Sequence, residues 1–309
     1  MFMPSEKDIK LLKMLLLSNE TSLLKACTGY LTNIFGKENV YDKTDFVYAA
    51  GNIPILLVAH LDTVLSSTPI IYTNKDKTIW TSKQGGLGAD DRAGVFAIMK
   101  LLQRGYRPSV LFTTGEESGG LGAMSFVKDF PEPPVATKYV IEIDRRGRGQ
   151  AVFYDCGNQD FVDYVETFGF IKHRGIFSDI SFICPQWDVA GVNLSAGYYH
   201  EHTDQEILQL PDLYFTIERV VNMLEDANKA AYFGFEGVEK NEKILYTSCK
   251  VCGKIVPYLS VINVRGVYAC PNCVNEFVHW CEVCNKPFFT AVETKQICED
   301  CSTEEHTND

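Results

Sequence analysis

The sequence predicts an α/β sandwich with a largely parallel central sheet, followed by a small cysteine-rich domain. Two observations predict this arrangement. From about residue 45 to residue 228, short apolar runs typical of strands alternate with segments whose apolar residues recur every three or four positions. Beyond residue 248, four Cys-x-x-Cys pairs lie within 53 residues. We therefore divide the chain into a main domain at 1–235, a linker at 236–247 and a cysteine-rich domain at 248–309.

The first third of the chain begins with two predicted helices and then changes to strands. Helices are expected at 5–17 and 21–35, because Leu, Met and Ile recur at helical spacing. Strands are expected at 45–50 and 54–59, and the second is a continuous apolar run typical of a strand buried on both faces. A polar hairpin around 74–76 and a glycine-rich loop at 85–88 follow.

The alternation continues to residue 228. Further helices are expected at 92–103, 122–128, 160–168 and 211–228, the last with proline in its first turn. Further strands are expected at 110–114, 139–143, 151–154 and 192–196. Strands that alternate with helices in this way form parallel sheets covered on both faces.

Candidate metal ligands follow four of the expected strands. His60 follows 54–59, the pair Glu116-Glu117 follows 110–114, Asp144 follows 139–143 and His202 follows 192–196. In such sheets, functional sites gather where strands end. Each residue alone is commonly a turn residue or a helix cap. Together with Asp90 and Asp91, before the expected helix at 92–103, the two histidines and the carboxylates are the ligands that two adjacent zinc ions need.

Two neighbouring residues have candidate supporting roles. Asp62 lies two positions after His60 and could orient its imidazole. Glu116 and Glu117 are adjacent, so one can bind metal while the other takes a proton from water. One residue of the Asp90-Asp91 pair could instead be an N-cap.

Five segments carry a resemblance to a known family. HLDT (60–63), GADDRAG (88–94), GEESGGLG (115–122), IEID (141–144) and HTDQE (202–206) resemble the co-catalytic di-zinc exopeptidases of peptidase family 28 and the related families 20 and 42. The resemblance spans about residues 45–228 and implies a zinc-exopeptidase-like three-layer fold. Only 27 residues separate Asp62 from Asp90 and 57 separate Asp144 from His202, which favours a compact domain like that of family 28.

The resemblance implies a role for each matching residue. Asp90 would bridge two zinc ions, His60 and Asp144 would complete one site, and Glu117 and His202 would complete the other. Asp62 would support His60, Glu116 would be the general base, and the peptide bond between Asp90 and Asp91 would be cis. His200 is an alternative to His202, which fits the family's frame better.

The expected activity is hydrolysis of an amide or peptide bond by a metal-activated water, with Glu116 accepting the proton. An aminopeptidase is the preferred interpretation, acting on a peptide or an acylated amino acid, and cobalt or manganese could replace the catalytic zinc. A deacylase or carboxypeptidase on the same site is the first alternative. The second is a zinc-ribbon adaptor whose hydrolase domain is a scaffold.

Other residues near the expected site have open roles. One of Arg145, Arg146 and Arg148 could hold a substrate carboxylate, although a solvated loop is the commoner arrangement. Tyr198 and Tyr199 could donate to a developing oxyanion or could pack at a strand end. Ser178-Asp179 is interpreted as a helix or turn cap.

The cysteine-rich domain has ligands for two structural zinc ions, namely Cys249, Cys252, Cys270, Cys273, Cys281, Cys284, Cys298 and Cys301. An expected hairpin of 256–262 and 267–269 resembles a zinc ribbon, and a second is expected at 285–290 and 292–296. We prefer sequential pairing, with the first four cysteines on one zinc and the last four on the other, over a cross-braced arrangement. His279 could replace a thiolate, although eight cysteines leave no vacancy.

Composition limits the partners. The net charge is -11, and the chain from Asn241 carries nine Asp and Glu against six Lys and Arg, which makes nucleic-acid binding unlikely and favours a protein partner for the zinc ribbons. No apolar run approaches the roughly 18 residues of a membrane span. The remaining cysteines, Cys27, Cys156 and Cys184, are expected to be reduced, and a cytoplasmic location is expected.

Overall fold

A computed structural model describes the first unit at residues 3–65, 67–83, 85–175 and 177–235. In the cysteine-rich region it describes residues 246–257, 262–264, 267–270, 273–274, 277–284, 286–290, 297–298 and 301. The chain divides into two compact units, Met1–Val238 and Glu239–Asp309, and this division falls inside the stretch 236–247. None of the helices in the described residues is long and apolar enough to cross a membrane.

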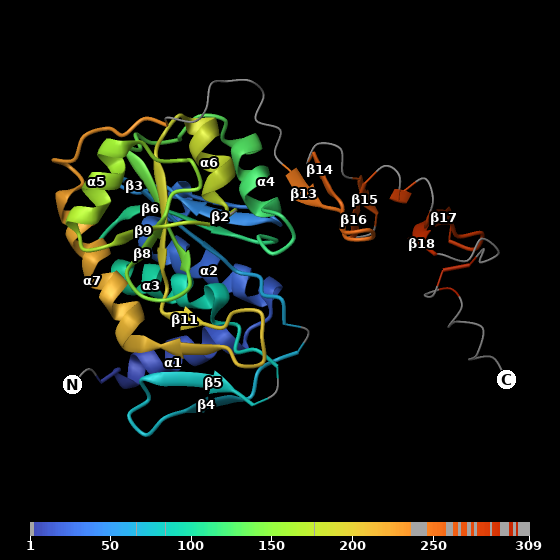
Figure 1. Cartoon of the computed structure of the whole chain (residues 1–309), viewed down its shortest axis with the longest axis horizontal. Coiled ribbons are helices and arrows are strands. Elements are labelled where there is room, and N and C mark those ends of the chain that lie inside the picture. The colour runs from blue at the N-terminus through green and yellow to red at the C-terminus, as the bar shows by residue number, and fades with distance from the viewer. Residues whose placement is uncertain are drawn as a thin grey trace. The chain divides into compact units, whose positions relative to one another are not determined.

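The first unit is built on an eight-stranded sheet (Figure 1). Its order is β1 (Val40–Asp42), β2 (Phe46–Ala49), β6 (Pro108–Thr113), β3 (Ile53–His60), β7 (Tyr139–Arg145), β10 (Gly191–Ser195), β8 (Gln150–Val152) and β9 (Ile171–His173). The four central strands β6, β3, β7 and β10 are parallel, and the chain adds antiparallel partners on both sides. The predicted, largely parallel central sheet is confirmed, and its antiparallel outer pairs are a further feature of the structure.

Helices cover both faces of this sheet (Figure 1). The helices are α1 (Glu6–Leu17), α2 (Glu20–Phe35), α3 (Ala89–Gln103), α4 (Leu121–Asp129), α5 (Gln159–Thr167), α6 (Ile180–Trp187) and α7 (Leu210–Asp226), with a short 3-10 turn at Lys37–Asn39. Helices α2 and α3 pack on one face, with α1 and α7 against α3, whereas α4 and α6 pack on the other. The continuous apolar run of β3 is buried, because both of its faces are covered.

Local sequence explains where the helices begin. Ser5 and Asp8 form a capping box at the start of α1, and Asn19 accepts a hydrogen bond from the backbone N–H of Ser22 in α2. The α6 helix was not predicted, because Pro185 interrupts its sequence and its residues are apolar on all sides.

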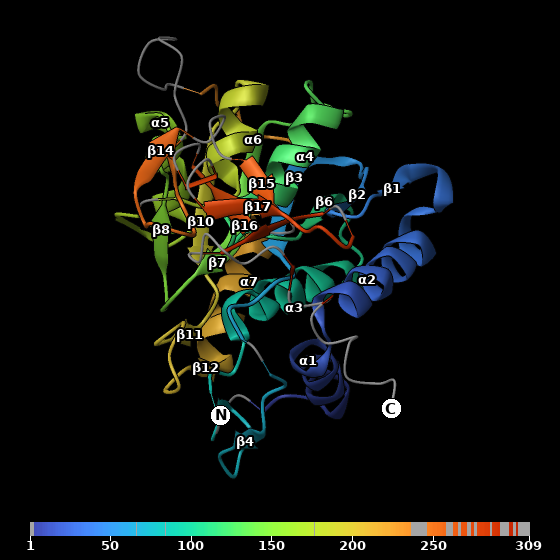
Figure 2. The same ribbon diagram turned by 90° about the vertical axis from the view of Figure 1, so that its right-hand side faces the viewer.

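A smaller four-stranded sheet lies beside the main one (Figure 2). Its order is β11 (Tyr198–Tyr199), β12 (Ile207–Gln209), β5 (Ile79–Ser82) and β4 (Ile71–Thr73). The pair β4 and β5 confirms the hairpin predicted around residues 74–76. Pairing of β12 with β5 brings the loop between β11 and β12 toward the chain that leads into α3.

The described residues of the second unit form three two-stranded hairpins. They pair β13 (Tyr246–Ser248) with β14 (Ile255–Pro257), β15 (Ile262–Val264) with β16 (Val267–Ala269), and β17 (Val278–Trp280) with β18 (Pro287–Phe289). Two of the hairpins fold back across a Cys-x-x-Cys pair, so each pair serves as the turn between two strands.

The predicted strand boundaries in this unit were partly wrong. Residues 263–264 were expected in a turn and belong to β15, while 256–257 pair with β13 instead of with 267–269. In the second expected hairpin, 285–290 contains β18, but its partner is the preceding strand β17. The strand expected at 292–296 lies outside the described residues.

Candidate metal centre

Four neighbouring strands bring the predicted ligands to one edge of the main sheet. His60 is the last residue of β3 and Asp144 is the last but one of β7. Glu116 and Glu117 lie just beyond the end of β6. His202 lies in the loop between β11 and β12, which follows β10. Asp90 lies at the start of α3, which packs against β3 and β7.

The first cluster of ligands surrounds the His60 imidazole. Its Nε2 atom lies 3.2 Å from Oδ1 of Asp90 and 3.4 Å from Oδ1 of Asp144. All three side chains are almost completely enclosed, with exposed fractions of 1%, 11% and 10%. One candidate ligand atom from each of them lies within 4.8 Å of the other two.

The second cluster surrounds the His202 imidazole and shares Asp90 with the first. Nε2 of His202 lies 3.1 Å from Oδ2 of Asp90 and 2.8 Å from Oε1 of Glu117. The two oxygens of Asp90 therefore face different histidines. A carboxylate in this position can bridge two cations, and the other four residues supply two ligands to each.

Asp90 and Asp91 are adjacent, but their carboxylates have different partners. The peptide bond between them is cis, as expected. Oδ1 of Asp91 accepts a hydrogen bond from the N–H of Gly94 at 3.0 Å, and its Oδ2 accepts one from the N–H of His60 at 3.3 Å. The alternative role of N-cap thus falls to Asp91, and Asp90 remains free to face both histidines.

Asp62 contacts both His60 and the segment that carries the two glutamates. Its Oδ1 lies 3.3 Å from Nδ1 of His60, and its carboxylate accepts hydrogen bonds from the N–H groups of Glu116 and Glu117, both at 3.1 Å. With Nδ1 of His60 next to Asp62, Nε2 of His60 faces Asp90. Candidate ligand atoms of His60, Glu116 and Glu117 lie within 4.8 Å of one another, so Glu116 is close to residues of both clusters.

Glu206, the last residue of the HTDQE segment, holds the loop that leads into Asp90, a role that was not predicted for it. Its carboxylate accepts four backbone hydrogen bonds, from Leu87 and Gly88 at 2.7 Å, from Ala89 at 2.8 Å and from Asp90 at 3.1 Å. Only 2% of the residue is exposed. Glu206 lies four positions after His202 in the same loop. Its buried side chain therefore connects the loop of His202 to the loop that leads into Asp90.

Hydrogen bonds from a buried polar network hold Asp144 in position. The Tyr198 hydroxyl donates to the backbone carbonyl oxygen of Asp144 at 2.6 Å and lies 3.0 Å from its Oδ1, and the Asn193 amide donates to its Oδ2 at 3.2 Å. The Ser178 hydroxyl hydrogen-bonds to Glu142 and lies 3.3 Å from Oδ2 of Asp144. Tyr198 therefore contacts a ligand instead of facing a substrate.

The cap interpretation of Ser178-Asp179 was wrong. Asp179 makes no side-chain cap on α6, and its Oδ2 instead accepts a 2.5 Å hydrogen bond from Thr113 in β6. Both residues belong to the polar network because the short, apolar α6 turns its N-terminus toward the ends of β6 and β7. Nothing in the local sequence distinguishes this arrangement from an ordinary cap.

The remaining candidates near the site have partners elsewhere. Arg146 pairs with Glu201 at 2.7 Å, and Arg148 pairs with Asp212 at 3.1 Å. Arg145 donates to Gln150 at 3.2 Å, and the Tyr199 hydroxyl donates to Asp212 at 2.7 Å. His200 is exposed and is absent from the described ligand clusters, so the geometry favours His202 over His200.

The charges of the cluster favour cations. Burial, together with the charge of Asp90, raises the pKa of Asp144 to about 6. Burial also raises the pKa of Glu116 well above its ordinary value. Hydrogen bonds to Asp90 and Glu117 raise the pKa of His202 to about 10. Several carboxylates thus lie close to the buried imidazole of His60 and the exposed imidazole of His202, and bound divalent cations would balance this negative charge. The donor set fits the two zinc ions that the sequence predicts.

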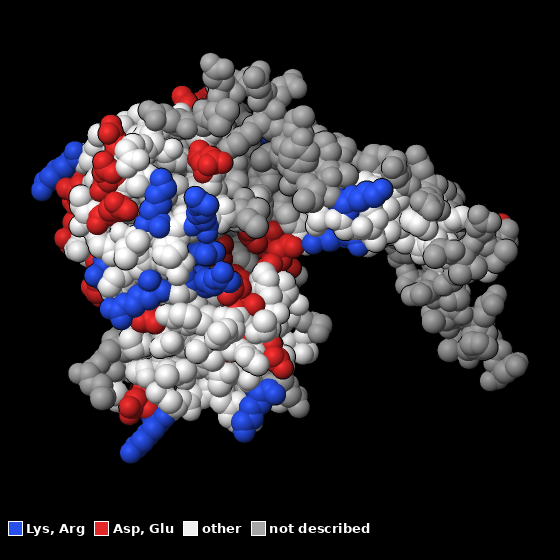
Figure 3. All heavy atoms as spheres, viewed as in Figure 1, with Lys and Arg blue, Asp and Glu red and all other residues white. Residues whose placement is uncertain are grey.

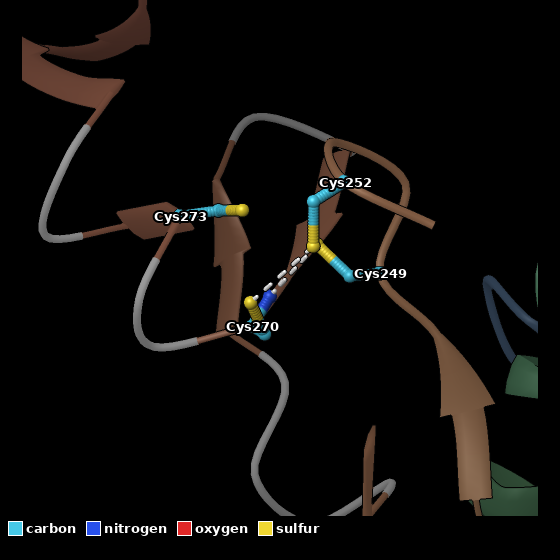
Figure 4. A group of neighbouring side chains, drawn as sticks. All are labelled: Cys249, Cys252, Cys270 and Cys273. Carbon is cyan, nitrogen blue, oxygen red and sulfur yellow. Dashed lines mark hydrogen bonds between the residues drawn. The ribbon is translucent and has the colours of Figure 1, made fainter. Parts of the chain in front are cut away.

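The cysteines of the second unit form two clusters in sequential order. Figure 4 shows the side chains of Cys249, Cys252, Cys270 and Cys273 turned toward one another, and the other four cysteines form a second group. In each cluster the sulfur atoms lie within 4.8 Å of one another. The N–H of Cys270 donates to Sγ of Cys249 at 3.2 Å, and backbone N–H donors from Cys284 and Cys298 lower the pKa of Cys281 to about 6. These thiols suit two tetrahedral zinc sites, and the described sulfur groups have the preferred sequential pairing.

The comparisons with known proteins concern the family and the fold of the first unit. Residues 44–167 match the model of peptidase family M28, which confirms the resemblance seen in the sequence. No curated protein matches the sequence.

Three solved structures show the same fold as the first unit. Aminopeptidase PepT from Bacillus cereus ATCC 10987 has 17% identity and a TM-score of 0.56, covering 73% of this chain and 99% of its own. A tripeptidase from Staphylococcus aureus subsp. aureus Mu50 has 13% identity and a TM-score of 0.56, covering 74% and 100%. The TET aminopeptidase of a marine-sediment Thaumarchaeota archaeon has 12% identity and a TM-score of 0.56, covering 71% and 97%. The predicted zinc-exopeptidase-like fold is confirmed.

Proposed function

We propose that the first unit, about residues 1–235, is a metal-dependent peptide hydrolase, and specifically an aminopeptidase with two catalytic zinc ions. His60, Asp90 and Asp144 would hold one ion, and Asp90, Glu117 and His202 the other. The observation that carries the proposal is that the two oxygens of Asp90 face two different histidines, at 3.2 Å and 3.1 Å. The family match over residues 44–167 supports peptide hydrolysis.

Zinc bound in this way would lower the pKa of a water molecule and polarise the scissile carbonyl. Glu116, which has a candidate ligand atom within 4.8 Å of those of His60 and Glu117, would accept the proton and return it to the leaving amine. Its raised pKa, caused by burial, suits a group that must both take and give a proton near neutral pH. Asp62 fixes the orientation of the His60 imidazole.

Two alternatives share this geometry. A deacylase or carboxypeptidase would use the same metal centre, because the ligands do not select which end of the substrate enters. An adaptor with a scaffold hydrolase domain would not need Glu116 beside a complete set of five ligands. We therefore consider the adaptor hypothesis the weakest of the three.

We assign the second unit two structural zinc ions and a protein-binding role. The thiol clusters supply the ligands, and metal binding would provide much of the folding free energy of so small a unit. On the face seen in Figure 3, Lys and Arg side chains of the first unit are interspersed with Asp and Glu side chains, which is unlike the basic surface of a nucleic-acid-binding protein. A reducing compartment such as the cytoplasm fits the free cysteines.

A substrate screen tests the proposal. Zinc-loaded wild type, Glu116→Gln and a control variant, Glu132→Gln, are incubated with aminoacyl amides, acylated amino acids and peptides. Glu132 is exposed, away from the ligand clusters. We expect wild type and the control to cleave aminoacyl amides, while Glu116→Gln loses about 100- to 10,000-fold in kcat and keeps its metal. Undiminished turnover by Glu116→Gln would contradict the assignment of the base, and inactivity of wild type on every amide would contradict the proposed function.

A further inference from the structure

A pocket adjoins the metal centre on the side of the N-terminal helices. Its volume is about 280 Å³, and it is lined by the turn between α1 and α2, by the chain after Asp62 and by the start of α3. Thr63 directly follows Asp62, and Gly88 lies two positions before Asp90. The wall is mixed, with Leu16, Leu17, Leu65 and Pro69 among hydroxyl-bearing side chains. None of the described residues that line the pocket is a candidate ligand of the two metal clusters.

Among the described residues that line the pocket, Glu20 is the acidic one and Arg92 the basic one. Glu20 is the first residue of α2, but capping of that helix is provided by Asn19, which accepts the Ser22 N–H at 2.8 Å. The Glu20 carboxylate instead accepts a hydrogen bond from the backbone N–H of Gly115, the residue before Glu116. It is half-buried and forms no salt bridge within the described part of the chain.

The position of Glu20 is fixed relative to the metal ligands. Nη1 of Arg92 donates to the backbone oxygens of Leu15 and Ser18, at 2.6 Å and 2.8 Å. Arg92 belongs to the same helix as Asp90 and is 4% exposed, so it fastens the turn between α1 and α2 to the helix of the shared ligand. Leu15, Ser18 and Glu20 precede residues 44–167, the segment that matches the peptidase family, whereas Arg92 lies within it.

We propose that Glu20 binds the N-terminal ammonium group of a peptide substrate and that the pocket receives the side chain of the N-terminal residue. This inference rests on the proposed function and identifies the end of the substrate that enters. In a peptide with a free N-terminus, the ammonium group is one carbon atom from the scissile carbonyl. A carboxylate held next to Glu116 is therefore placed for that group.

The same charge disfavours the competing substrates. An acylated amino acid has no ammonium group that could pair with the Glu20 carboxylate. The leucine and proline side chains of the wall suit an apolar residue. The expected substrate class is thus a peptide with a free amine and an apolar N-terminal residue.

Binding measured without turnover tests the inference. In the zinc-loaded Glu116→Gln background, calorimetry compares leucinamide with 4-methylpentanamide, which has the same skeleton without the amine. We expect leucinamide to bind about 10- to 100-fold more tightly, and Glu20→Gln to remove this difference while leaving the affinity for 4-methylpentanamide unchanged. Glu132→Gln, the control in the same background, should keep the full difference.

Two results would overturn the role of Glu20. One is equal binding of the two amides by the Glu20-containing protein, and the other is a preference for leucinamide that survives Glu20→Gln. Matching unfolding temperatures for Glu20→Gln and Glu132→Gln would show that a loss of preference is not a loss of fold. Because the assay reads binding, it decides the role of Glu20 even if the wild-type protein hydrolyses none of the amides in the substrate screen.

Discussion

Replacement of Glu206 by glutamine should destabilise the first unit far more than loss of an ordinary surface carboxylate. The two carboxylate oxygens of Glu206 each accept two backbone N–H groups, over distances of 2.7 to 3.1 Å. Glutamine keeps one acceptor oxygen, but its amide nitrogen is a donor and would face the other two N–H groups. Each buried N–H left without a partner costs about 1–3 kcal/mol, so the expected loss is about 2–6 kcal/mol.

The assay is urea unfolding of the full chain, followed by circular dichroism at 222 nm, because helices α1 to α7 all lie in the first unit. Glu218→Gln is the matched control, since Glu218 pairs with Arg104 at the surface and its loss should cost at most about 1 kcal/mol. We also expect Glu206→Gln to bind catalytic zinc more weakly, because the N–H of Asp90 is one of the four donors. A variant within about 0.5 kcal/mol of wild type would refute the reasoning.

Three further predictions concern the histidines, an ion pair and the cysteines. His202→Ala should lose about one catalytic zinc per chain by elemental analysis, whereas His200→Ala should keep both; equal losses would argue against His202 as the ligand. Burial alone would raise the pKa of Asp8, but hydrogen bonds from Lys100 and Ser5 hold it below its ordinary value of 3.8. The Asp8 carboxylate contributes stability above pH 3.8, and this contribution is lost as the pH falls through the lowered pKa of Asp8. Lys100→Met should therefore reduce the unfolding temperature at pH 7. The difference from wild type should become smaller toward pH 3. Cys252→Ser should weaken one structural zinc site and leave the zinc on Cys281, Cys284, Cys298 and Cys301 in place; weakening of both sites together would favour a cross-braced arrangement.

The grouping of the candidate ligands could be predicted because each of these residues follows a recognisable strand or glycine loop. His60 ends a continuous apolar run, and Asp144 follows another, so their meeting at one sheet edge follows from parallel pairing. The residues that follow His202 also favoured it over His200, because they fit the frame of the resembling families. These features are local or depend only on the order of the strands.

The supporting residues could not be predicted because their roles depend on contacts between distant segments. Glu206 contacts the N–H of Leu87 across 119 positions of sequence, and Asp179 contacts Thr113 across 66. Glu206 ends the HTDQE segment, but nothing local to that segment indicates which distant N–H groups its carboxylate accepts, and Asp179 looks like an ordinary cap residue. The register of the hairpins in the second unit was missed for another reason: the Cys-x-x-Cys pairs act as turns, and the strands are only three residues long.

The bridging role of Asp90 is the central claim, and anomalous diffraction at the zinc edge from crystals of the zinc-loaded protein tests it most directly. We predict two peaks in the first unit, one beside each carboxylate oxygen of Asp90, with His60 next to one peak and His202 next to the other. A single peak at this position, or two peaks that do not share Asp90, would contradict the account.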